Sequence, residues 1–152
     1  DFKKKAKKIS ELTKDISEFL HENLKLEFKK NTKKRNIKIA YHSACSMQHG
    51  QKIHSEPIDL IKKTGNEVVE IPNGHLCCGS AGTYNMLQTE IADQLLKEKV
   101  ANIEKVKPDI ISTGNIGCIV QIANATKIPI LHTAEIIDWY TGGPKPKILS
   151  EL

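Results

Sequence analysis

Residues 110–118 read IISTGNIGC: a β-branched run, a turn that contains glycine, and then a cysteine. The run from Ile110 to Thr113 predicts a strand, and the apolar pattern of residues 117–125 predicts a helix after it. Cys118 comes five residues after that strand. Ligands of open α/β sheets bind outside the carboxyl ends of the strands. This stretch therefore predicts an α/β sheet with a thiol at its ligand-binding edge.

The same order of strand and then helix recurs through residues 37–140. Strands that alternate with helices form a parallel sheet, with right-handed crossovers that place helices on both faces. The expected fold class is α/β, a four-stranded, doubly wound parallel sheet of the Rossmann or flavodoxin-like kind in the spatial order 2-1-3-4. The strands are expected at residues 37–41, 68–71, 110–113 and 128–131, and the helices at residues 55–63, 89–106, 117–125 and 134–140.

An additional N-terminal segment precedes this sheet. Apolar residues at helical spacing predict one amphipathic helix over residues 5–22. Residues 24–28 alternate apolar and polar side chains, which is a weak strand pattern, and the polar residues 29–36 are expected to form a loop or linker. The predicted organisation is a basic amphipathic helix and linker at residues 1–35, a cysteine-rich domain at residues 36–145 and a C-terminal tail at residues 146–152.

The positive charge of the chain is concentrated at its N-terminal end. Residues 1–35 carry 12 Lys and Arg against 6 Asp and Glu, whereas the remaining residues carry 11 against 12. Nucleic-acid readers interleave aromatic residues with such charges to stack on bases, and this segment does not. The basic helix therefore predicts a solvated or docking surface, with no nucleic-acid partner.

Composition excludes several other classes of protein. With 39% hydrophobic and 27% charged residues, the chain is of ordinary globular composition, and no stretch approaches the roughly 18 apolar residues of a membrane span. The chain begins at Asp1 without a secretory signal, so we expect a processed or excised part of a longer protein. The missing signal and the ligand-like cysteine spacing favour a reducing, cytoplasmic compartment.

All the cysteines follow expected strands. Cys45 follows the first strand by four residues, the pair Cys77 and Cys78 with Gly79 follows the second, and Cys118 follows the third. Since the carboxyl ends of parallel strands meet at one edge, we expect the thiols to converge there. Thiolates select soft metals such as zinc and iron–sulfur clusters.

Four interpretations of these thiols compete. Buried cysteines are common in cores, but these fall in loops. A thiol/disulfide switch at Cys77 and Cys78 leaves the other two unexplained. Zinc accepts four thiolates, or three and a histidine, although adjacent ligands strain a single ion. In a [4Fe-4S] cluster, which usually has four cysteine ligands, adjacent sulfurs bind different irons, so this interpretation is favoured.

Three segments carry a resemblance to a known family: YHSACSMQHGQ at residues 41–51, HLCCGSAGTY at residues 75–84 and GNIGC at residues 114–118. They resemble the cysteine-rich CCG family, which includes the carboxy-terminal domain of glycolate oxidase iron-sulfur subunits and the cysteine-rich subunit of heterodisulfide reductase. The resemblance covers about residues 37–140. The family pattern is one cysteine, then Cys-Cys-Gly, then Cys-X-X-Cys. Here Asn115 stands at the first cysteine of the last motif, which leaves four thiolates instead of five.

The resemblance implies a [4Fe-4S] cluster bound by Cys45, Cys77, Cys78 and Cys118. It also implies an electron-transfer domain of a glycolate oxidase or dehydrogenase complex, which takes electrons from flavin-containing subunits that oxidise a 2-hydroxy acid and has no turnover by itself. The expected location is cytoplasmic, with peripheral association at the inner membrane through the complex left open. Residues expected around the ligands are His42, His75, Gly79 and Asn115, with His75 the best replacement ligand and Asn115 a weak ligand or hydrogen-bond donor.

The alternative function is of a different class. The same residues could hold a structural zinc ion, or form a cluster-free scaffold that docks partner subunits through the basic leading helix. Anaerobic purification separates the two, because a cluster brings iron and acid-labile sulfide and a zinc site brings neither.

Overall fold

A four-stranded parallel sheet lies at the centre of the computed structural model, which describes residues 1–23, 25–28 and 36–150. The strand order is β2-β1-β3-β4, so the predicted fold class and the order 2-1-3-4 are confirmed. In register, Ala40 of β1 pairs with Val69 of β2 on one side and with Ile111 of β3 on the other. The strands are β1 (Lys38–Tyr41), β2 (Glu67–Val69), β3 (Ile110–Thr113) and β4 (Ile130–His132).

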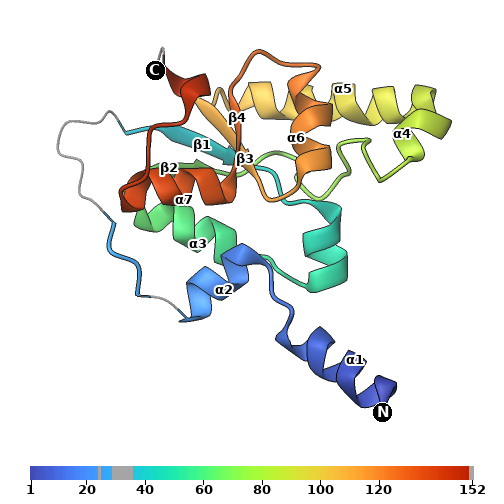
Figure 1. The fold of residues 1–152 in the computed structure, drawn as a ribbon. Coiled ribbons are helices and arrows are strands. Elements are labelled where there is room, and N and C mark those ends of the chain that lie inside the picture. The colour runs from blue at the N-terminus through green and yellow to red at the C-terminus, as the bar shows by residue number, and fades with distance from the viewer. Residues whose placement is uncertain (24, 29–35, 151–152) are drawn as a thin grey trace.

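Helices cover both faces of the sheet (Figure 1). One face packs on α5 (Thr89–Lys105) and α6 (Ile116–Ala123), and the other on α3 (Glu56–Lys63) and α7 (Thr133–Thr141). Side chains alternate across a strand, so each strand supplies both cores. Ile111 joins the core beneath α5 and α6, and its neighbour Ile110 joins the core beneath α3 and α7. Burial on both faces explains why the strands are almost continuously apolar.

The N-terminal region differs from its prediction. An N-terminal helix is present as expected, but the prediction of one continuous helix over residues 5–22 is wrong, because α1 (Phe2–Leu12) and α2 (Ile16–Asn23) are separate. Thr13 is extended, and a carboxylate oxygen of Asp15 accepts a hydrogen bond from the Ser17 backbone N–H at 2.8 Å. Asp15 therefore caps a new helix and ends the old one. Helix α2 packs on α3, whereas α1 buries no residue and extends away from the sheet (Figure 1).

The weak strand pattern of residues 24–28 is also wrong where the structure describes it. Residues 25–28 form no strand; Leu26 and Phe28 are half-buried, and Phe28 packs against the core beneath α7. The alternation therefore reflects packing of a coil segment on the core. Leu24 and residues 29–35 of the loop expected at residues 29–36 lie outside the described residues.

Side chains close the amino-terminal edge of the sheet. The Asp109 carboxylate accepts a hydrogen bond from the Lys38 backbone N–H at 2.8 Å. The side-chain oxygen of Asn66 accepts one from the Ile37 N–H at 3.2 Å and another from the Tyr140 hydroxyl at 3.1 Å. The backbone groups at the start of β1 are thus paired without water.

Three short segments were not expected: the π-helical turn η1 (Ser46–Gln51), α4 (Tyr84–Leu87) and the 3₁₀ turn η2 (Lys147–Leu149). Turn η2 buries Leu149 in the core beneath α7, so this part of the C-terminal segment is anchored. Within the described residues, every helix is too short or too polar to cross a membrane.

Candidate metal centre

The loops after β1, β2 and β3 bring the cysteines to the carboxyl edge of the sheet. The Sγ atoms of Cys78 and Cys118 and a ring nitrogen of His42 all lie within 4.8 Å of one another. Cys45 and Cys77 lie beside them, close enough for Cys77 to raise the pKa of Cys45. All four thiols are reduced and unpaired by disulfides. The structure thus brings Cys78 and Cys118 together with His42, and it places Cys45 and Cys77 near enough to affect the pKa of Cys118.

Cys78 and Cys118 form an inner, buried pair. A hydrogen bond from the Cys118 thiol is the main cause that lowers the pKa of Cys78, and the His42 ring and the Ser80 N–H lower it further. The same hydrogen bond to Cys78, together with burial, raises the pKa of Cys118. The fold thus stabilises a thiolate at Cys78, the form in which cysteine binds metals.

Cys45 and Cys77 form an outer, half-buried pair. Burial, followed by the neighbouring Cys77, raises the pKa of Cys45 to about 11. The Cys77 sulfur accepts a hydrogen bond from the Gly79 backbone N–H at 3.3 Å. Although Cys77 and Cys78 are adjacent in sequence, one is matched with Cys45 and the other with Cys118.

His42 is a buried side chain with no conventional partner. Its exposed fraction is 0%, and within the described part of the chain neither ring nitrogen makes a hydrogen bond of normal geometry. The hydroxyl of Thr113, on the adjacent strand, is buried and unpartnered as well. An unsatisfied buried polar group costs about 1–3 kcal/mol, so such groups need an explanation. The position of His42 beside two thiols indicates a site shaped for a metal or another polar ligand.

Two glycines let the loops approach closely. Gly79 has φ +90°, and a Cβ there would lie 2.4 Å from the Ala92 carbonyl oxygen of α5. A Cβ on Gly114 would lie 2.6 Å from Met47 Sδ. Gly79 therefore allows the Cys77–Cys78 turn to rest directly on α5, and Gly114 allows the Cys45 loop to close over the end of β3.

Turn η1 positions Cys45, which immediately precedes it. The Ala44 carbonyl accepts hydrogen bonds from the N–H groups of both Met47 and Gln48 at 3.0 Å, and the Gln48 side chain donates to the Ser43 carbonyl at 2.7 Å. Met47 is buried against Gly114. Single π turns often occur at functional sites. The sequence carried no periodic pattern that could have predicted this one.

Asn115 caps α6. Its side-chain oxygen accepts a hydrogen bond from the Cys118 N–H at 3.2 Å, and its amide donates to Ser46 Oγ at 3.4 Å. Asn115 thus fixes the first turn of α6, which carries Cys118, and ties it to the residue after Cys45. Since Asn is among the best N-cap residues, this position has a structural role that is independent of any metal.

His75 lies apart from the sulfurs. It is exposed and lines a hollow of about 590 Å³ together with Tyr41, Ser43 and His54, and no cysteine lines this hollow. The histidine that joins Cys78 and Cys118 is His42. The pairing of β1 with β3 accounts for this placement, because the His42 N–H donates to the Ser112 carbonyl at 2.8 Å and extends the ladder.

The sequence analysis missed Lys99, a buried residue of α5. Leu96, Lys99 and Ile103 recur at helical spacing, and all three are buried. A lysine at an inward position of an amphipathic helix was the signal that could have identified it. The four cysteines each act to raise the pKa of Lys99, although burial is the larger effect and lowers it.

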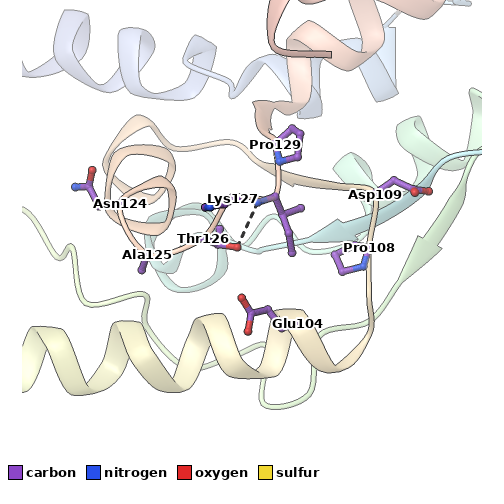
Figure 2. A pocket seen from close by; sticks show the side chains of 9 residues that line it. Glu104, Pro108, Asp109, Asn124, Ala125, Thr126, Lys127 and Pro129 are labelled. Atoms are coloured by element: carbon purple, nitrogen blue, oxygen red, sulfur yellow. Dashed lines mark hydrogen bonds between the residues drawn. The ribbon is translucent and has the colours of Figure 1, made fainter. Parts of the chain in front are cut away.

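Another hollow, of about 720 Å³, lies at the opposite edge of the sheet (Figure 2). It is lined by residues that precede β3 and β4, including Pro108, Asp109 and Pro129, and by Glu104 at the end of α5. Its lining contains no cysteine or histidine. The size of a hollow therefore does not identify the functional site of this fold. The position of the thiols does.

Comparison with known proteins gives relatives from two groups. The chain is 37% identical to the glycolate oxidase iron-sulfur subunit of Escherichia coli (strain K12), over 88% of the chain and 32% of the relative. It is 29% identical to lactate utilization protein A of Geobacillus sp. (strain WCH70), over 91% of the chain and 60% of the relative. The identity to lactate utilization protein A of Halalkalibacterium halodurans is 31%, over 90% of the chain and 58% of the relative.

The chain thus spans about a third to three fifths of the length of these relatives. A model of the cysteine-rich domain, CCG, matches residues 39–123. The match begins in β1 and ends with α6, so it includes all four cysteines, His42 and Lys99. The family resemblance expected from the three sequence motifs is confirmed, and the chain belongs to the cysteine-rich CCG domain family.

Proposed function

We propose that this domain binds an iron–sulfur cluster of the [4Fe-4S] kind through Cys45, Cys77, Cys78 and Cys118, and that it relays electrons. The observation that carries the proposal is the division of the adjacent cysteines between two partners. Cys77 is matched with Cys45, and Cys78 with Cys118. Two neighbouring thiolates that face different partners suit a polynuclear cluster, in which each sulfur binds its own iron.

The surroundings of the thiols fit such a group. The buried, unpartnered polar atoms of His42 and Thr113 lie on the side of the sheet that carries Cys78 and Cys118. Cys118 is in the first turn of α6, where helix N–H groups stabilise negative charge. The Gly79 backbone N–H donates a hydrogen bond to the Cys77 sulfur, and hydrogen bonds to sulfur tune the reduction potential of iron–sulfur centres.

The protein's own residues would hold the group and control access to it. A bound cluster supplies one-electron redox chemistry. The buried inner pair, Cys78 and Cys118, would shield it from water on the side of the core. The half-buried outer pair, Cys45 and Cys77, faces towards the surface, so this is the side through which electrons would enter and leave.

The relatives suggest the biological setting. Their names are glycolate oxidase iron-sulfur subunit and lactate utilization protein A, and both refer to 2-hydroxy acids. We therefore assign the domain to electron transfer in 2-hydroxy acid oxidation, most specifically in a glycolate oxidase complex. Flavin-containing partner subunits would carry out the oxidation, and this chain would have no turnover alone. The complex would be cytoplasmic, with peripheral attachment at the inner membrane.

One observation favours a second candidate, a structural zinc site. The donor atoms of His42, Cys78 and Cys118 lie within 4.8 Å of one another, a compact group that suits a single tetrahedral ion with one more thiolate. In that case the outer thiols would not both be used. The domain would then be a scaffold that docks partner subunits.

Metal analysis of the full chain, purified without oxygen, tests both candidates. The proposal expects brown protein with about four iron and four acid-labile sulfide per chain, and a paramagnetic signal that changes on reduction. Cys77→Ser and Cys78→Ser should each disturb the cluster, whereas Ser80→Ala, in the same turn, should leave it bound. One zinc per chain, with full zinc content in Cys77→Ser, would refute the cluster and support the second candidate.

A further inference from the structure

Lys99 is an anomaly in the core. Its exposed fraction is 1%, and it is the largest of the fully buried side chains. Lysine is almost never fully buried unless its charge is paired, because removing an ammonium group from water is costly. A residue in this position therefore needs a local cause.

The partners of Lys99 do not neutralise its charge. The ammonium donates hydrogen bonds to the Gly74 carbonyl at 3.0 Å and to the Asn73 carbonyl at 3.4 Å. The ion pairs in the described part of the chain involve Lys7, Lys14 and His21, and none of them includes Lys99. Two carbonyl dipoles satisfy the donors of an ammonium group but leave a net positive charge inside the protein.

The groups that face this charge are the thiols. All four cysteines act electrostatically on Lys99, and Lys99 in turn acts on Cys45. The carbonyls that Lys99 holds belong to the turn that leads from β2 to Cys77 and Cys78. Lys99 therefore joins α5 to the loop that supplies half of the cysteines. Four thiolates with their metal core carry net negative charge, which is what a buried, unpaired cation can compensate.

We propose that Lys99 is the fixed counter-charge of the cysteine site, which holds the turn before Cys77 in place and stabilises the reduced state of the bound cluster. This inference rests on the proposed cluster function. Lys99 is a positioning residue, since it transfers neither the electron nor a proton. Reduction adds one negative charge to the cluster, so a nearby positive charge favours the reduced form and raises the reduction potential.

A series of substitutions separates charge from hydrogen bonding. Lys99→Arg keeps the charge and the donors, Lys99→Gln keeps a donor without the charge, and Lys99→Met keeps only the volume. Lys97→Met is the matched control, because Lys97 is exposed on the same helix. The measurement is the reduction potential of the cluster in the full chain, by anaerobic titration with dithionite and mediators, with iron content and urea unfolding recorded for each variant.

The expected result is at least a tenfold shift towards the oxidised form in Lys99→Gln and Lys99→Met, about 59 mV for a one-electron couple, with Lys99→Arg and Lys97→Met close to the parent protein. If Lys99→Met fails to unfold cooperatively, the Arg and Gln variants decide the matter. If Lys99→Gln loses the cluster and Lys99→Arg keeps it, the result also supports a role for the positive charge of Lys99.

Two outcomes overturn the inference: a parental potential in Lys99→Gln, or cluster loss from the Arg variant although its cluster-free form is folded. Failure of the cluster proposal looks different. In that case the parent protein itself contains no iron or sulfide.

Discussion

The two edges of the sheet differ in whether their buried polar groups have hydrogen-bond partners. At the amino edge, Asp109 and Asn66 accept hydrogen bonds from the backbone at the start of β1. At the carboxyl edge, buried side-chain atoms of Tyr41, His42, Ser43 and Thr113 have no hydrogen-bond partner of normal geometry among the described residues. The same strands connect the two edges, so the difference in hydrogen bonding arises from the residues at each end of the strands. The amino edge stabilises the fold, and the carboxyl edge gives up stability to form a site.

The largest expected effect lies at the carboxyl edge. Replacing Cys118 with Ser should lower iron and sulfide content at least tenfold, because Cys118 is the inner partner of Cys78 and a hydroxyl is a poor ligand for this cluster. Iron analysis after anaerobic purification measures it. Ser112→Ala is a control on the preceding strand. If Cys118→Ser retains its full iron content, the proposal that the inner pair binds the cluster is refuted.

The reactivity of the Cys45 thiol should depend strongly on pH in the protein without metal. Burial raises the pKa of Cys45 to about 11, so below that pH Cys45 is mostly protonated and unreactive. Its alkylation rate should rise about tenfold per pH unit from neutral pH upward, since only the thiolate attacks. Iodoacetamide labelling followed by peptide mass mapping measures the rate, with Cys45→Ser as the blank. A rate that levels off below about pH 9 would contradict the buried position of this thiol.

The amino edge should respond in stability alone. Asp109→Ala removes the acceptor for the Lys38 N–H and should lower the free energy of unfolding by about 1–3 kcal/mol. Asp109→Asn keeps an acceptor oxygen and should cost less. Urea unfolding measures both. Iron content per folded chain should not change, and a loss of iron in Asp109→Ala would show that the two edges are coupled.

A smaller effect on stability is expected at two neighbouring residues, Ser112 and Thr113, and it should have opposite signs at the two positions. The Ser112 hydroxyl is hydrogen-bonded to the Thr133 hydroxyl at 3.1 Å, whereas the Thr113 hydroxyl has no partner in the described structure. In the protein without metal, Ser112→Ala should therefore destabilise by about 1 kcal/mol, and Thr113→Val should stabilise by a similar amount. Urea unfolding of the two variants decides. Equal destabilisation by both would refute the idea that the carboxyl edge gives up stability.

The smallest effect is expected outside both edges. Ile9 in α1 is 66% exposed, and α1 buries no residue. Ile9→Ala should change the free energy of unfolding by less than about 0.5 kcal/mol. Ile61→Ala is the matched control, because Ile61 of α3 is fully buried in the core, and this substitution should cost about 2–5 kcal/mol. A large effect of Ile9→Ala would mean that α1 packs on the domain.

The sheet could be predicted because its determinants are local. Strand β3 was expected at Ile110–Thr113 and lies there, since burial on both faces produces a short run rich in β-branched residues. The strand order 2-1-3-4 was expected as the simplest order for a doubly wound sheet with helices on both faces, and the structure has it. The break at Thr13 was missed, because capping by Asp15 interrupts a helical pattern that continues through it.

The site was predictable in part. The number of residues between each strand and its cysteine predicted that the cysteine loops lie at one edge of the sheet. It could not distinguish the inner pair of cysteines from the outer pair. The position of His42 depends on the register of β1 against β3, and turn η1 depends on Met47 packing against Gly114. Lys99 was overlooked, although it lies at helical spacing from Leu96 and Ile103, because lysine is almost always found at the surface. The placement of His42 and the formation of turn η1 depend on tertiary contacts, which no local pattern contains.

X-ray absorption at the iron and zinc edges of anaerobically purified protein tests the central claim most directly, because it reports the neighbours of each metal. The account predicts iron with sulfur neighbours and with further iron atoms close by, and this iron-to-iron signal should fall in Cys77→Ser and in Cys78→Ser. A single zinc ion with mixed sulfur and nitrogen neighbours, unchanged in Cys77→Ser, would contradict it.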